Sequence, residues 1–70
     1  MQTFLVYTKT VQSPQGKVNQ ELGREEVSAE LGSLEGLRDY VVNKEGKLFK
    51  VVEKIADLRG EELRILVRDA

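Results

Sequence analysis

The N-terminal part of the chain has the pattern of a strand that ends in a tight turn. Most residues from Thr3 to Gln12 are β-branched, aromatic or leucine, namely Phe4, Leu5, Val6, Tyr7, Thr8, Thr10 and Val11. Such residues favour a strand that is partly covered on both faces. The strand ends at residues 13–16, Ser-Pro-Gln-Gly, where proline fixes φ and glycine tolerates a positive φ. The pattern predicts a hairpin with a short second strand over residues 17–22.

The length of the turn predicts the register of this hairpin. With a three-residue loop at residues 14–16, antiparallel counting places Val11 opposite Asn19 and Lys9 opposite Glu21. The second pair joins opposite charges across the strands, which favours this register.

Residues 24–35 fit both a helix and a strand. Val27, Leu31 and Leu34 recur at helical spacing, whereas Val27, Ala29 and Leu31 alternate as they would in a strand. The helix formers in this stretch, its early acidic residues and the glycine after Leu31 favour a helix. We therefore expect a short helix or turn here, with a strand as the alternative.

The C-terminal half predicts a three-stranded meander. Three extended runs, over residues 37–43, 47–55 and 61–69, are separated by two turn segments. In the first turn, Asn43 and Gly46 specify a type I turn followed by a glycine bulge, which places Val41 opposite Phe49.

The last hairpin is predicted to close through a five-residue loop at residues 56–60. This register sets Lys54 across from Glu62 and Lys47 across from Asp69, and both pairs join opposite charges. The predicted core face then carries Phe49, Val51, Ile55, Leu63, Ile65 and Val67.

Glu53 does not fit this pattern, because it falls on the apolar face of the predicted hairpin. A one-residue slip of the preceding hairpin, which would bring Arg38 to it, is one explanation. A β-bulge is the other.

These elements predict one β-rich α+β domain over residues 1–70, with a small antiparallel sheet of four or five strands. The opening Met1-Gln2-Thr3-Phe4 and the order of hairpin, helix and strands resemble the ubiquitin-type β-grasp. Modifier and sulfur-carrier members of that family end in Gly-Gly, whereas this chain ends Val67-Arg68-Asp69-Ala70, which disfavours a carrier role. The alternative architecture is a small open β-barrel of five strands.

The residue types present argue against catalysis. The chain has 70 residues with no Cys and no His, which removes the commonest metal ligands and general base. No serine has a base at a matched spacing, neighbouring acids such as Glu61 and Glu62 point apart, and no glycine-rich phosphate loop occurs. We expect no enzyme activity, no catalytic residue, no cofactor, no metal and no small-molecule substrate.

The longest apolar runs, such as residues 4–7 and 65–67, are far shorter than the roughly 20 residues of a spanning helix. The start of the chain lacks the features of a secretory signal. We therefore expect a cytoplasmic protein without a membrane partner.

Interaction with another macromolecule remains as the expected function. Because so short a chain has a thin core, it gains burial by associating with itself or with a protein partner. The alternative is nucleic-acid binding through a basic sheet face, although the net charge is −1 and exposed aromatic residues are few. The candidate interaction face consists of Lys50, Val52, Lys54, Arg64, Leu66 and Arg68.

Overall fold

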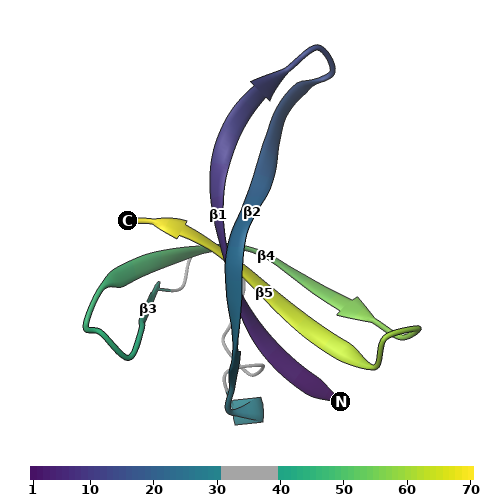
Figure 1. Ribbon diagram of the computed structural model, residues 1–70, viewed down its shortest axis with the longest axis vertical. Coiled ribbons are helices and arrows are strands. Elements are labelled where there is room, and N and C mark those ends of the chain that lie inside the picture. The colour runs from purple at the N-terminus through teal and green to yellow at the C-terminus, as the bar shows by residue number, and fades with distance from the viewer. Residues whose placement is uncertain (31–39) are drawn as a thin grey trace.

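Five strands form a single mixed sheet. The computed structural model describes residues 1–30 and 40–70 of the chain. The strands are β1 (Gln2–Ser13), β2 (Gly16–Val27), β3 (Tyr40–Val42), β4 (Leu48–Asp57) and β5 (Glu62–Asp69). Their order in the sheet is β2-β1-β5-β4-β3, so β2 and β3 are its edges (Figure 1).

The pairing of β1 with β5 makes the sheet mixed. These strands run parallel, with Leu5 beside Ile65 and Tyr7 beside Val67, whereas the other neighbouring strands are antiparallel. The expectation of a purely antiparallel sheet is therefore wrong. The predicted meander of β3, β4 and β5 is confirmed, and β1 joins it to the N-terminal hairpin. A central place for β1 agrees with its apolar side chains on both faces.

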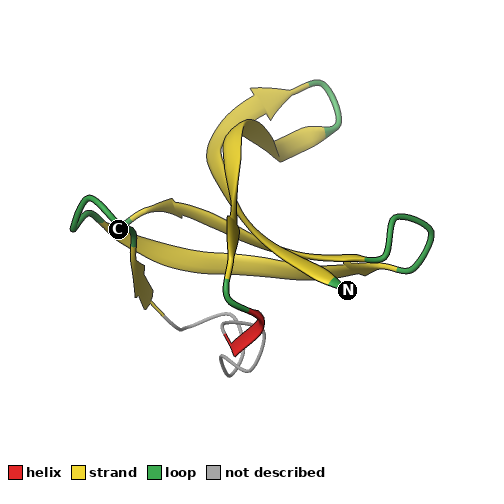
Figure 2. Ribbon diagram, turned by 60° about the horizontal axis from the view of Figure 1, so that its bottom comes forward, coloured by secondary structure: helices red, strands yellow, loops and turns green. Residues whose placement is uncertain are grey.

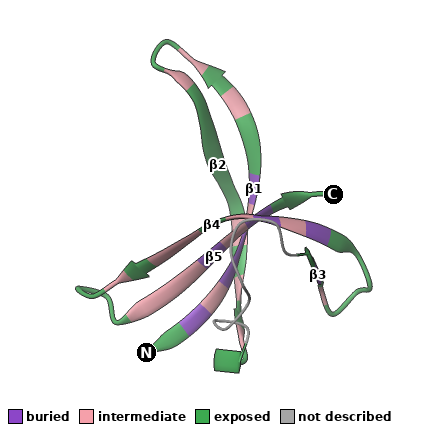
Figure 3. Ribbon diagram, turned by 180° about the vertical axis from the view of Figure 1, so that it is seen from behind, coloured by how far each residue is buried: buried purple, intermediate pink, exposed green. Residues whose placement is uncertain are grey.

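One face of the sheet, the core face, carries the main hydrophobic core. Its buried members are Leu5, Val41, Phe49, Val51, Ile65 and Val67. The prediction of Phe49, Val51, Ile65 and Val67 as core residues is confirmed. Figure 3 shows that the buried segments gather where β1, β4 and β5 cross.

The N-terminal hairpin has a shorter loop than the sequence predicted. Ser13 is opposite Gly16, so Val11 faces Val18 and Lys9 faces Gln20. The predicted pairs Val11–Asn19 and Lys9–Glu21 are therefore wrong by one residue, because Gly16 joins the ladder instead of the loop. Its φ of +117° is the glycine-specific conformation that the sequence did predict.

Strand β2 continues through the segment for which a helix was expected. Residues 24–27 are extended, which corrects the helix prediction for them, whereas residues 29 and 30 have 3₁₀ conformation and 31–39 lie outside the described residues. Leu22 is an extra residue between the pairs Tyr7–Gly23 and Thr8–Glu21, which makes it a β-bulge. Gly23 directly follows this bulge, where a residue without a side chain is common.

The turn between β3 and β4 is confirmed as predicted. Gly46 donates its backbone N–H to the Asn43 carbonyl at 3.0 Å, and its φ is +86°. The Asn43 side chain also accepts the backbone N–H groups of Glu45 and Lys47. Val41 lies opposite Phe49, as expected.

The hairpin of β4 and β5 has a different register from the predicted one. Asp57 pairs with Glu62, so the loop comprises residues 58–61, and Lys54 faces Ile65 rather than Glu62. The Asp57 carboxylate accepts the backbone N–H groups of residues 59 and 60, which stabilises this loop. The predicted partners Lys47 and Asp69 do form an ion pair, at 3.1 Å, although Asp69 lies opposite Phe49.

A bulge at Val52 explains the position of Glu53. The pair Val51–Val67 is followed by Glu53–Leu66, so Val52 has no partner in the ladder. The bulge turns Glu53 to the face opposite the core, which settles the two alternatives in favour of a bulge. It also places Ile55 opposite Arg64 and away from the core, so Ile55, like Leu63, is only partly buried.

The fold is thus a small β-rich sheet with almost no helix among the described residues. Neither the β-grasp nor the barrel is confirmed, because no described helix covers the sheet and β2 does not pair with β3. The sheet is strongly twisted, and the β1–β2 hairpin rises steeply from the plane of β4 and β5 (Figure 2). In residues 1–30 and 40–70, no helix has the length and apolarity that crossing a bilayer requires.

Candidate interaction surfaces

The structure divides the predicted interaction face between the two sides of the sheet. Lys50 and Arg68 lie opposite each other on β4 and β5, and Leu66 shares their side, the outward face. Lys54 lies opposite Ile65 and therefore belongs to the core side. The bulge at Val52 causes this division, because each extra residue reverses the alternation that follows it.

Arg64 is on the outward face but is engaged by acidic neighbours. Its guanidinium lies 3.4 Å from a Glu62 carboxylate oxygen and 3.6 Å from one of Asp57. These two carboxylates largely neutralise the positive charge of Arg64. Of the predicted basic cluster, Lys50 and Arg68 are the two cations that the register places directly together on this face.

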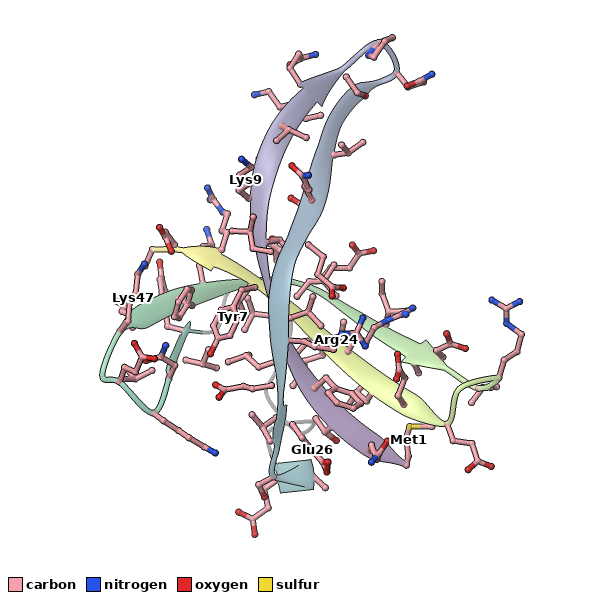
Figure 4. All side chains as sticks on the ribbon, in the orientation of Figure 1. Met1, Tyr7, Lys9, Arg24, Glu26 and Lys47 are labelled. Atoms are coloured by element: carbon pink, nitrogen blue, oxygen red, sulfur yellow. The ribbon has the colours of Figure 1, made fainter. Side chains whose placement is uncertain are left out.

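Arg24 connects β2 to β5 across β1 (Figure 4). It forms ion pairs with Glu21 at 2.9 Å and with Glu62 at 3.4 Å, and it lies over the Phe4 ring. The Arg24 hydrogen bond lowers the pKa of the Glu21 carboxyl from its ordinary value, and the same bond raises the pKa of Arg24. The side chains of Arg24, Glu21, Glu62 and Arg64 thus lie over the outward face beside Phe4.

The centre of the outward face is also closed to solvent. Val6 is only 1% exposed, although it lies on the side opposite the main core. Its ladder partners are Leu66 on β5 and Arg24 on β2, and Phe4 precedes it on the same face. The sheet therefore buries apolar side chains on both sides at β1, as the first strand's composition predicts.

An exposed apolar patch lies on the outward face beside the β3 edge. It consists of Tyr40, Val42 and Leu48, whose exposed fractions are 55%, 62% and 47%. Val42 is paired with Leu48, and Tyr40 with Lys50, so all share one face. The sequence analysis did not assign this patch to the interaction face. The alternation of Val41 inward with its two neighbours outward is the signal that would have found it.

The outer half of the β1–β2 hairpin forms an arm that projects from the sheet (Figure 1). Strand β1 pairs with β2 along its length but with β5 only from Gln2 to Tyr7. From Thr8 onward the described ladder partner of β1 is β2 alone. The Thr8 hydroxyl donates to the Val67 carbonyl at 2.9 Å, where β5 leaves β1. The outer edge of β2 has no strand partner among the described residues.

A groove of about 710 Å³ lies between the end of β2 and β3. Residues 25–28 and 40–44 line its sides, and Leu5 contributes to it from β1. Sequence reasoning missed the groove because it assigned residues 25–28 to a helix rather than to the strand that forms this wall.

The Tyr7 hydroxyl, on the core face near this groove, donates a hydrogen bond to Glu25. Burial, reinforced by this bond, raises the pKa of Tyr7 above its ordinary value of 10.0.

A group whose pKa rises on folding stabilises the fold below its unfolded pKa and loses that effect as the pH increases. We expect the tyrosinate absorbance of Tyr40→Phe, which retains Tyr7, to titrate above pH 10.0 in the folded protein. A midpoint at or below the ordinary value would contradict the placement of Tyr7.

Neither a cluster of metal ligands nor a similar protein assigns a function to these surfaces. Within the part of the chain that the structure describes, no three His, Cys, Asp or Glu side chains gather as a metal site. The chain matches no protein-family model, no curated protein and no solved structure.

Proposed function

We propose that this protein is a non-enzymatic association module that binds copies of itself or other chains of a larger assembly. The observation that carries the proposal is the apolar patch of Tyr40, Val42 and Leu48. Each of these side chains is about half exposed or more, and together they lie next to β3, whose outer edge has no strand partner within residues 1–30 and 40–70. Covering such a patch removes apolar surface from water, which is the main driving force of protein association.

The form of the patch supports a protein partner. Lys50 and Arg68 border it on the same face, so it has an apolar centre with polar neighbours. This is the usual arrangement of a protein interface, and an open edge strand beside it offers backbone N–H and C=O groups to a second chain.

Nucleic-acid binding is the second candidate, and the charge distribution supports it less. Lys50 and Arg68 are adjacent, but Arg64 is paired with acids and Lys54 lies on the opposite side of the sheet. Two neighbouring cations on a chain of net charge −1 provide little affinity for phosphate groups.

The test is the molar mass of the purified protein by light scattering. We expect a species heavier than the 7.9 kDa monomer that persists at moderate salt, because apolar burial is not screened. The double variant Val42→Glu, Leu48→Glu should lower that mass and remain folded, since both side chains are exposed. Leu58→Glu is the matched control, because Leu58 is 78% exposed in the loop between β4 and β5, and it should leave the mass unchanged.

A wild-type protein that stays at the monomer mass would refute self-association. Binding of a short oligonucleotide by that monomer, with an affinity that falls steeply with salt, would favour the second candidate. An equal fall in mass for the patch variant and for Leu58→Glu would show that the patch is not the contact.

A further inference from the structure

We infer that the outer edge of β2 pairs with β2 of a second copy, antiparallel and in a single register. This inference rests on the proposed self-association but uses the edge opposite the apolar patch. Strand β2 is twelve residues long and ends the sheet, with no strand beside it in the described parts of the chain. Open edges of this length bind other strands unless their side chains prevent it. The charges along β2 therefore decide whether a second copy can pair with this edge.

The ladder with β1 shows which β2 side chains share a face. Lys17 lies opposite Gln12, and Glu26 lies opposite Phe4. Even-numbered residues of β1 all point to one face, because β1 has no bulge. Their partners Lys17 and Glu26 therefore point to the same face of the sheet, the outward face, although they lie at opposite ends of β2. Without the extra residue at Leu22 they would point to opposite faces. The same count places Asn19 and Arg24 on the outward face.

When two identical strands pair antiparallel around a two-fold axis, the N-terminal end of each strand lies beside the C-terminal end of the other. If the axis passes between Glu21 and Leu22, all of β2 is paired, and Lys17 of each copy lies beside Glu26 of the other. Asn19 then lies beside Arg24. Each contact occurs twice by symmetry, so one dimer contains two Lys–Glu pairs. The charges of β2 are therefore complementary to those of a second β2 in this register.

A second register obeys the same face rule but is less complete. It places Lys17 beside Glu21 of the other copy, and it overlaps only residues 16–22. Fewer backbone hydrogen bonds form in it, and the Glu21 carboxylate is already bound by Arg24 at 2.9 Å. The full-length register is favoured for both reasons.

Charge reversal tests the register. Lys17→Glu alone and Glu26→Lys alone each place like charges against each other twice, and each should weaken the β2-mediated dimer at least about tenfold. The double variant K17E/E26K restores opposite charges, and so does an equal mixture of the two single variants. We expect both to recover the wild-type dissociation constant in sedimentation equilibrium. Lys9→Glu is the matched control, because Lys9 is an exposed lysine of the same arm on the inner strand β1, and it should have no effect.

The outcomes separate this inference from the proposed function. If the wild type associates and the patch variant weakens it, but charge reversal on β2 has no effect, the β2 pairing is wrong and the proposed function stands. Rescue of Lys17→Glu by Glu21→Lys, with no rescue by Glu26→Lys, would overturn the full-length register. A wild type that remains monomeric overturns both the β2 pairing and the self-association on which it rests.

Discussion

Replacing Val6 with Asp is expected to remove a large part of the protein's stability. Val6 is 1% exposed on the outward face, between the ladder partners Leu66 and Arg24. Its carboxylate replacement would lose the apolar contacts of Val6 and bury a charge, at a combined cost of more than about 4 kcal/mol. A chain of this length has a total stability of roughly 4 to 10 kcal/mol. Circular dichroism and urea titration of the variant measure the loss.

The control for Val6→Asp is Leu58→Asp, in the loop between β4 and β5 and outside both proposed contacts. Leu58 is 78% exposed, so this change should leave the protein folded and cost about 1 kcal/mol or less. If Val6→Asp were as stable as Leu58→Asp, the outward face would be open at its centre, and the pairing of β1 between β2 and β5 would be wrong.

Replacing Ile65 with Ala is expected to lower the free energy of unfolding by about 2–4 kcal/mol. Ile65 is fully buried, and it lies between Leu5 on β1 and Lys54 on β4, at the centre of the core face. Removing its side chain leaves a cavity that neighbours on three strands would have to fill. Thermal and urea denaturation would both detect a loss of this size in a domain with so small a reserve of stability.

Leu58→Ala provides the comparison for Ile65→Ala. Leu58 is 78% exposed in the β4–β5 loop, and its truncation should change the free energy of unfolding by about 0.5 kcal/mol or less. Similar losses in the two variants would mean that Ile65 is not a core residue.

The sequence by itself determined where most strands run and which residues point inward. Strand propensity and the alternation of apolar residues are local properties, and they correctly identified β1, β4 and β5 and the buried side chains Phe49, Val51, Ile65 and Val67. The turn at Asn43 and Gly46 was predictable for the same reason, since its hydrogen bonds close within a few residues.

Only the tertiary structure decided the helix-like segment, because long-range pairing overrides propensity. Glu25 and Glu26 favour a helix locally, but the ladder places them opposite Leu5 and Phe4 of β1, where alternating burial holds them in β2.

The partners of the strands and the two bulges were likewise decided by tertiary structure. Paired residues of β1 and β5, for example Leu5 and Ile65, are sixty positions apart along the chain, so no local pattern reports their parallel pairing. A bulge adds one residue with little local signature, yet it reverses the face of every residue that follows. The bulge at Val52 therefore separated Lys54 from Arg64 and divided the predicted basic face. The bulge at Leu22 brought Lys17 and Glu26 to one face. Only their pairing with Gln12 and Phe4 of β1, which share a face, reveals this arrangement.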